Sequence, residues 1–237
     1  QLDTSAIYKN PPTVKSLAFS PDGKLLATYG SGGRISIRNA ETGEEIHRFE
    51  GGVHIPAGLV SFCNDCIAFS PDGKLFAAGS FGKGGEGSKP GELRVWDAEK
   101  GELLHVWKTK DSVQDGKDNA AIHGIAFSPE SRRIAIACSD GDVWIWDVAT
   151  KQVSEKLKGH RSKVRRVAFS PDGRTIASAG LDRTVCVWNA ETGKQINAFE
   201  IDVPRVNAVT FSPDGKFLVA GGGDFVRKGE IRMWRMH

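Results

Sequence analysis

The sequence Phe-Ser-Pro-Asp-Gly recurs along the chain, and its spacing indicates the type of fold. FSPDG stands at residues 19–23, 69–73, 169–173 and 211–215, and a diverged copy, FSPES, stands at residues 127–131. The phenylalanines that open these copies are separated by 50, 58, 42 and 42 residues. A self-similar period of about 42 residues predicts an array of small repeated units, with the extra length of the longer copies placed in loops.

Each unit carries a second landmark, an alternating stretch that ends in an aromatic residue. These stretches are residues 95–97, 145–147, 187–189 and 233–234. In the first unit Arg38 stands where the other units have Trp. Short β-rich segments such as residues 175–178 and 184–188 lie between Pro-Asp-Gly and Glu-Thr-Gly turns, in which Pro presets φ, Asp bonds its own backbone and Gly accepts positive φ. We therefore predict four short strands in every unit.

A unit of about 42 residues with four strands and a Trp-Asp ending resembles the WD-repeat (WD40) family over essentially the whole chain. The resemblance implies an all-β fold, a β-propeller of five four-stranded blades forming one domain over residues 1–237. The blades are marked by Phe19, Phe69, Phe127, Phe169 and Phe211. Family members most often have seven blades, so five is an atypical number.

The resemblance also implies that strand exchange between the termini closes the ring. From Trp234 to the C-terminus and on from Gln1 to Phe19 takes 22 residues, against 23 from Trp188 to Phe211. We therefore expect residues 4–9 to supply the outer strand of the last blade. A piece of a seven-bladed protein, cut at equivalent points of two blades, would give the same residue count between its ends, and this alternative stays open.

The fourth unit matches a buried polar tetrad that is typical of the family, whereas the other units match it only in part. The matching residues are His160, Ser178, Asp182 and Trp188. In the family such residues satisfy one another inside the blade. A catalytic His-Asp pair is the alternative for His160 and Asp182, but no nucleophile is indicated beside them. We predict no catalytic residues and a protein that is not an enzyme.

Three other patterns suggest chemistry, and each has a simpler explanation. The glycine pattern at residues 82–87 lacks the following helix that a dinucleotide site needs, so we interpret it as a loop insertion. Cys63 and Cys66 have the spacing of a metal or redox pair with His54 nearby, but plain thiols are favoured over a disulfide or a metal. The acidic loop at residues 111–119 lacks the EF-hand spacing. We expect no cofactor and no metal.

Composition argues against nucleic-acid and membrane partners. The chain has 32 Lys and Arg against 29 Asp and Glu, a net charge of +3, with the two signs interspersed. No apolar run approaches the length of a membrane helix, and the N-terminus lacks the features of a signal peptide. We favour a cytoplasmic protein, although a chain that starts at Gln1 leaves export open.

The resemblance places a binding surface where the inner strands of the blades begin, which we call the top face. One residue per blade stands there, two positions before the apolar residue of the inner strand: Lys15, Asp65, His123, Arg165 and Asn207, which we call the top-face ring. Leu181 and Phe225 are expected at its rim. The mixed charges of this ring would suit an acidic or phosphorylated peptide.

Long loops in the first three units predict a second contact surface. These loops are residues 51–65, 81–91 and 108–121. The expected apolar anchor in the first loop is Val53, Ile55, Pro56, Leu59 and Val60.

The sequence therefore predicts a protein-interaction scaffold, a subunit or domain of a larger assembly whose partners are other proteins. Two alternatives remain, a carbohydrate-binding propeller and a sensory or regulatory module cut from a larger multidomain protein.

Overall fold

The structure is a computed structural model, and it describes residues 14–30, 34–49, 66–80, 90–112, 120–224 and 229–236. Asp65, Phe225, the apolar anchor of the first long loop and the expected N-terminal strand at residues 4–9 lie outside the described residues. So do Cys63, His54 and the glycine pattern at residues 82–87. Cys66 is described and is disulfide-bonded, so the preference for a plain thiol at this position is wrong.

The described chain is built almost entirely from antiparallel strands, arranged as five successive sheets that we call blades 1 to 5. Blade 1 contains β1 (Val14–Phe19), β2 (Leu25–Gly30), β3 (Ile35–Asn39) and β4 (Glu45–Phe49). Blade 2 contains β5 (Ile67–Phe69), β6 (Leu75–Gly79), β7 (Glu92–Asp97) and β8 (Leu103–Lys108), and the 3-10 helix η3 (Thr109–Ser112) follows it.

Blade 3 contains β9 (Ile122–Phe127), β10 (Arg133–Cys138), β11 (Asp142–Asp147) and β12 (Gln152–Lys158). Blade 4 contains β13 (Val164–Phe169), β14 (Thr175–Gly180), β15 (Thr184–Asn189) and β16 (Gln195–Glu200). Blade 5 contains three described strands, β17 (Val206–Phe211), β18 (Phe217–Gly222) and β19 (Glu230–Arg235). The predicted all-β propeller architecture, with one blade per Phe-Ser-Pro unit, is confirmed.

The Ser-Pro-Asp-Gly turns close the first hairpin of a blade through hydrogen bonds within the turn itself. Ser20 Oγ donates to Asp22 Oδ1 (2.6 Å) and accepts the backbone N–H of Leu25 (2.9 Å), while Asp22 Oδ1 accepts the N–H of Lys24 (3.1 Å). Gly23 has a φ of 73°, in the left-handed region that glycine enters without strain. The same Ser-to-Asp bond, again 2.6 Å, occurs at Ser70, Ser170 and Ser212. The repeat thus encodes its own hairpin.

Neighbouring blades are joined by four hydrophobic cores, one at each junction between consecutive blades. The core between blades 4 and 5 shows the arrangement: Val185 and Val187 of β15 meet Val206 and Val209 of β17, and Leu218 of β18 packs with them. Equivalent residues form the other three cores. Each inner blade therefore has two apolar faces, one toward the preceding blade and one toward the following blade.

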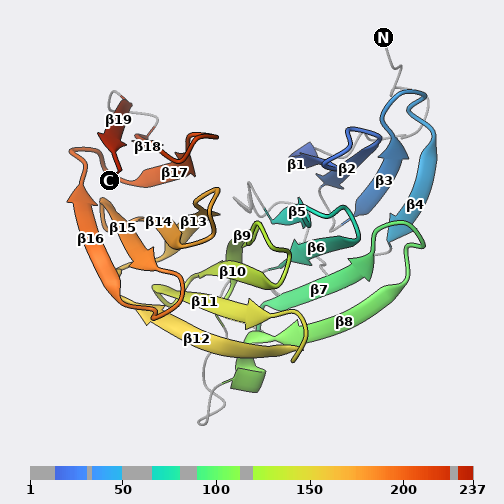
Figure 1. Ribbon diagram of the computed structural model, residues 1–237, viewed down its shortest axis with the longest axis horizontal. Coiled ribbons are helices and arrows are strands. Elements are labelled where there is room, and N and C mark those ends of the chain that lie inside the picture. The colour runs from blue at the N-terminus through green and yellow to red at the C-terminus, as the bar shows by residue number, and fades with distance from the viewer. Residues whose placement is uncertain are drawn as a thin grey trace.

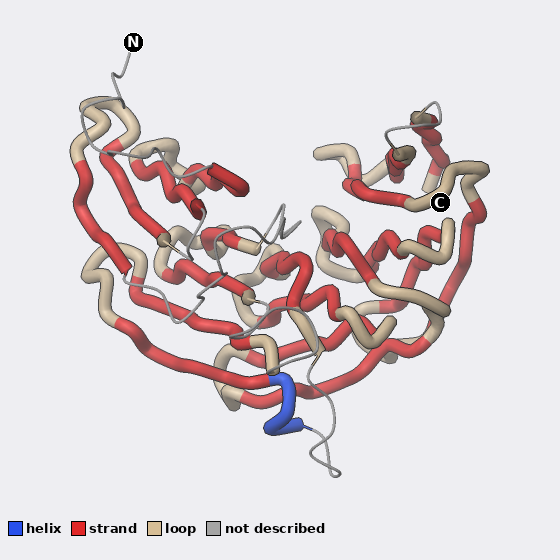
Figure 2. Tube along the Cα trace, turned by 180° about the vertical axis from the view of Figure 1, so that it is seen from behind, coloured by secondary structure: helices blue, strands red, loops and turns tan. Residues whose placement is uncertain are grey.

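The blades follow one another around an arc whose two ends stand apart (Figure 1), and the view from behind shows the same opening (Figure 2). Successive inner strands contact each other, from β1 to β5, β5 to β9, β9 to β13 and β13 to β17. No contact of that extent joins β17 or β19 back to β1 in the described part of the chain. Closure of the ring is therefore not detected, and the strand that was expected to provide it lies outside the described residues.

Candidate functional site

The polar tetrad of blade 4 is fully formed. His160, in the loop between β12 and β13, directs Nδ1 at both carboxylate oxygens of Asp182 (3.0 and 3.1 Å) and Nε2 at Ser178 Oγ (2.7 Å). Trp188 Nε1 donates to the same Ser178 Oγ (2.8 Å). The backbone N–H of Arg161 also donates to Asp182 Oδ2 (2.7 Å). These bonds tie an interblade loop, two strands and a turn together inside one blade.

Within the tetrad, His160 and Asp182 form an ion pair that is shielded from solvent. Burial alone would lower the pKa of His160, but the Asp182 carboxylate, together with the Cys186 sulfur that lies 3.9 Å from Nδ1, outweighs it and raises this pKa to about 9. Burial also works against the ionised form of Asp182, yet the hydrogen bonds from His160 and Arg161 hold its pKa well below the usual range. His160 is therefore protonated and Asp182 ionised at neutral pH. A histidine that keeps its proton at this pH is a poor general base, so the geometry fits a structural role.

Blade 3 keeps the tryptophan of the tetrad but not its acceptor. Trp146 occupies the place of Trp188, and Ile136 occupies the place of Ser178 in the strand register. The buried Nε1 of Trp146 consequently has no hydrogen-bond partner among the described residues. In blade 1, Arg38 replaces the tryptophan and pairs with Glu45 (2.9 Å). The side chain at this position is therefore hydrogen-bonded in blades 1 and 4 but not in blade 3.

This difference predicts unequal effects of one substitution at two equivalent positions. Trp188→Phe should lower the free energy of unfolding by about 1–2 kcal/mol more than Trp146→Phe, because only Trp188 loses a hydrogen bond to a buried hydroxyl. Both variants remove the same volume from a fully buried site, so each serves as the control for the other. Urea unfolding of the two variants measures the difference. Equal losses would show that the Trp188–Ser178 bond contributes nothing.

The residues of the top-face ring share a local geometry that the sequence does not reveal. Each described member is the extra residue of a β-bulge at the start of its inner strand: the pairing register skips Lys15 in β1, His123 in β9, Arg165 in β13 and Asn207 in β17. A bulge re-aims the side chain of the unpaired residue and commonly lies next to functional sites. In blades 1, 3, 4 and 5 the repeat therefore places one re-aimed side chain at the same end of the sheet.

The ring residues differ in how far they reach solvent. Asn207 is exposed and its amide donates to the carbonyl of Gly223 (3.1 Å), whereas Lys15 and Arg165 are half-buried. His123 is buried, which makes it a supporting residue of this surface. At the rim, half-buried Leu181 is anchored by its N–H to the carbonyl of Lys163 (2.9 Å).

The inner strands of the blades surround a hollow of about 780 Å³. Its lining is largely apolar and includes residues from all five blades, with Arg166 as the single ionisable side chain. Burial lowers the pKa of Arg166 to about 10, so the guanidinium stays charged at neutral pH. The hollow therefore has a largely apolar wall and one cationic side chain, Arg166, which follows Arg165 of the top-face ring in the sequence.

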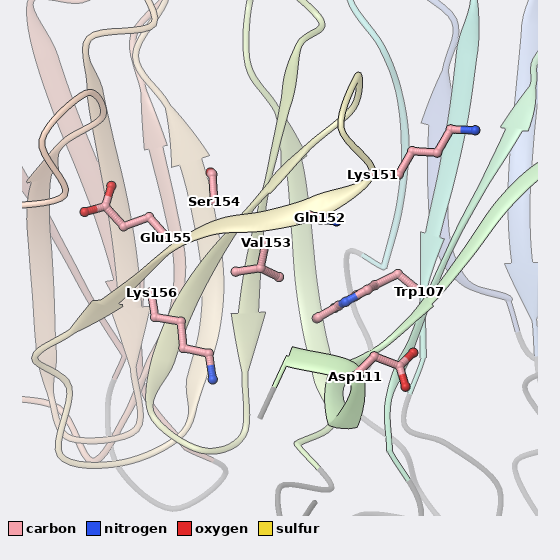
Figure 3. A pocket seen from close by; sticks show the side chains of 8 residues that line it. All are labelled: Trp107, Asp111, Lys151, Gln152, Val153, Ser154, Glu155 and Lys156. Carbon is pink, nitrogen blue, oxygen red and sulfur yellow. The ribbon is translucent and has the colours of Figure 1, made fainter. Parts of the chain in front are cut away.

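A second groove, of about 640 Å³, lies on the outer side of the arc and was not predicted (Figure 3). It is lined by Trp107 at the end of blade 2, Asp111 of η3, Lys151 and residues 152–156 of β12. Figure 3 shows Val153 and Lys156 pointing from β12 toward the side on which Trp107 and Asp111 lie. The ammonium of Lys156 lies 3.6 Å from the ring centre of Trp144, a cation–π contact that holds it at this wall.

Among the described residues, no group of three or more His, Cys, Asp or Glu side chains is placed to hold a metal ion. Cys138 and Cys186 are free and buried, and burial raises the pKa of the Cys138 thiol well above its usual value, which makes it a poor nucleophile. In the same part of the chain, no helix has the length and apolar character needed to cross a bilayer.

Two family models match the chain. The first, described as WD domain, G-beta repeat, matches residues 64–97, 151–189 and 194–235. The second, described as anaphase-promoting complex subunit 4 WD40 domain, matches residues 5–65 and 105–162. Together the two models reach all five blades.

Curated relatives are similar over part of the chain. The chicken (Gallus gallus) serine-threonine kinase receptor-associated protein is 27% identical over 137 residues, which is 56% of this chain and 34% of that protein. Rat (Rattus norvegicus) apoptotic protease-activating factor 1 is 27% identical over 159 residues, 65% of this chain and 11% of that protein. A periodic tryptophan protein 2 homolog of Neurospora crassa is 27% identical over 146 residues, 61% of this chain and 14% of that protein. The matched region thus spans about a third or less of these relatives.

Proposed function

Because this chain belongs to the WD-repeat family, we propose that it is a non-catalytic protein-interaction scaffold that holds a protein partner on its top face. The observation that carries the proposal is the β-bulge repeated at Lys15, His123, Arg165 and Asn207. The bulge lies at the same end of the sheet in blades 1, 3, 4 and 5, so it gives side chains on separate blades a common direction. Such a set can grip one partner at several points.

Rigidity is the mechanism of this function. The strands that bear the ring are fixed by ladder hydrogen bonds and by the cores between blades, so little conformational entropy is lost there on binding. Lys15 and Arg165 are cations, and charge-assisted hydrogen bonds to carboxylates or phosphates are stronger than neutral ones. We propose that the partner presents an acidic or phosphorylated segment to Lys15 on blade 1 and Arg165 on blade 4.

The test compares three proteins as bait in a native extract: the unmodified chain, Lys15→Glu with Arg165→Glu on the top face, and Lys24→Glu with Lys194→Glu as a control. Lys24 and Lys194 are exposed residues of turns at the opposite ends of the sheets, so both double variants make the same charge change. Melting temperatures that match the unmodified chain verify the fold. We expect the top-face variant to lose at least about 90% of a defined protein partner that the control retains, because two charge-assisted contacts are reversed.

Retention of that partner by the top-face variant together with its loss from the control variant would place the interface on the opposite face. Equal retention by all three proteins would place it on the long loops or the outer groove. Either result contradicts the proposal.

A further inference from the structure

A groove of about 760 Å³ opens between blades 1 and 2 at the end of the sheets opposite the top face, and we call it the turn groove. Its walls are the Ser-Pro-Asp-Gly turns of both blades, two residues at the start of β4 and the two residues that follow β7. All of these segments lie within the described residues. The turn groove contains no residue of the top-face ring, so binding there would be a separate property of the chain.

The junction between blades 3 and 4 shows which chemical group this position accepts. There Arg133, the first residue of β10, reaches across to blade 4, and its guanidinium donates to the carbonyls of Ala190 and Gly173 (3.3 Å to the latter). The same guanidinium pairs with Glu130 of its own blade (3.0 Å). It also lies 5.6 Å from the ring centre of Phe169. One arginine side chain therefore joins the turns of two blades.

The acceptors of this arrangement recur between blades 1 and 2, but the arginine does not. In the strand register Leu25 takes the place of Arg133. The residues that match Ala190, Gly173 and Glu130 are, in that order, Ala98, Gly73 and Asp22. All three line the turn groove. Within the described part of the chain, the carbonyls of Gly73 and Ala98 accept no hydrogen bond, so the turn groove has the acceptors for a guanidinium that the chain itself does not supply.

The charges of the turn groove favour a cation. Asp22, Asp72 and Glu99 contribute three carboxylates to its walls, whereas Lys24 is the single ammonium among the described residues that line it, 3.9 Å from Asp22. The hydrogen bond from Ser20 lowers the pKa of Asp22, so this carboxylate is ionised at neutral pH. A positively charged side chain is therefore attracted to this junction.

Apolar surface lies beside these carboxylates. Ile46 is 45% exposed, and it is the unpaired residue of a β-bulge in β4. Pro21 and Pro71 are exposed on the two turns, and half-buried Leu25 packs against the core between blades 1 and 2. The methylene groups of a long cationic side chain and an apolar neighbour would both find contacts here.

We propose that the turn groove binds an extended segment of a partner protein in which an arginine stands next to an apolar residue. The guanidinium donates to the carbonyls of Gly73 and Ala98 and pairs with Asp22. The apolar neighbour of the arginine packs on Ile46. Arginine is preferred to lysine, because its planar fork of N–H groups reaches several acceptors at once, whereas an ammonium is a compact point charge.

A peptide titration tests the proposal. The probe is a rhodamine-labelled peptide, Gly-Ser-Val-Arg-Val-Ser-Gly, and its binding to the chain is followed by fluorescence anisotropy. The variant Asp22→Asn with Glu99→Gln removes two carboxylates and keeps the turn, since the amide oxygen still accepts the bonds from Ser20 and Lys24. We expect its dissociation constant for the peptide to be at least about tenfold higher than that of the unmodified chain.

The matched control is Asp172→Asn with Glu191→Gln. These residues occupy the corresponding positions of blade 4, and Asp172 makes the same bonds to Ser170 and to the backbone of Arg174 (2.6 and 3.0 Å). Neither residue lines the turn groove, so the same change of net charge should alter the dissociation constant less than about twofold.

A second variant supplies the missing guanidinium from the chain itself. Leu25→Arg places an arginine where blade 3 has Arg133, so it should occupy the acceptors and weaken peptide binding at least about tenfold. Leu25→Met keeps an apolar side chain of similar size at this position and should bind the peptide within about twofold of the unmodified chain. Melting temperatures within about 3 °C of the unmodified chain verify the fold of all variants.

Three outcomes would overturn the proposal. The first is no binding of the arginine peptide by the unmodified chain at about 1 mM. The second is equal binding by the carboxylate variant and its blade 4 control. The third is equal binding of the arginine peptide and its lysine counterpart, which we expect to bind at least about fivefold more weakly. None of these outcomes bears on the top face, which lies at the other end of the sheets.

Discussion

Replacement of Asp182 with alanine is expected to lower the free energy of unfolding by about 3–5 kcal/mol, because the change leaves His160 buried without its counter-ion. The side chain of His160 has no exposed surface, and both carboxylate oxygens of Asp182 lie within 3.1 Å of its Nδ1. The N–H of Arg161 would lose its acceptor as well. Urea unfolding followed by tryptophan fluorescence measures the loss.

Asp140 supplies the matched control for this substitution. It takes the place of Asp182 in blade 3, but it is exposed and its carboxylate accepts the N–H of Asp142 in the turn (3.0 Å). Asp140→Ala should therefore cost less than about 1 kcal/mol. Comparable losses for the two variants would mean that the tetrad adds no more stability than an ordinary turn.

The stabilisation from His160 should also depend on pH. Its pKa rises from 6.5 in the unfolded chain to about 9 in the folded protein, so folding favours the protonated form. The contribution is complete below about pH 6.5 and decreases by roughly 3 kcal/mol as the pH rises through 9. Because the pKa of Asp182 is lowered in the folded protein, its contribution is complete above about pH 4 and is lost progressively as the pH falls further, through the folded-state pKa.

Comparison with His160→Gln isolates this dependence above about pH 5, because titrating groups outside the tetrad contribute equally to both proteins and Asp182 stays ionised in that range. The difference in unfolding free energy between the unmodified chain and the variant should be largest between about pH 5 and 6 and should shrink toward pH 10. A difference that stays constant over this range would show that His160 is not charged in the folded protein.

The sequence was sufficient to predict the features that depend on local chemistry. The Ser-Pro-Asp-Gly turns were predictable because Ser20 and Asp22 bond within the turn and Gly23 supplies the positive φ. The tetrad was predictable because His160, Ser178, Asp182 and Trp188 all match one family pattern, and the structure places hydrogen bonds between these side chains.

Features that depend on neighbouring blades were not predictable in the same way. Leu17 and Ile67 occupy the same position in their repeats and look alike in the sequence, yet Leu17 is exposed and Ile67 is buried, because within the described residues only Ile67 is packed against a preceding blade. His123 was expected on the binding surface, but it is only 4% exposed at the start of β9. The bulges at the ring positions also escaped prediction, since a register shift leaves no mark on residue type.

Photo-cross-linking from chosen positions is the most direct test of whether a partner binds the top face. A photoreactive amino acid at Asn207 lies on the top-face ring, and the same amino acid at Glu191, an exposed turn residue at the opposite end of blade 4, is the matched control. The account predicts that the partner retained from native extract cross-links at position 207 at least about tenfold more strongly than at position 191, because its contact lies at the ring. Cross-links that concentrate at position 191 would contradict the account and place the binding surface at the opposite end of the blades.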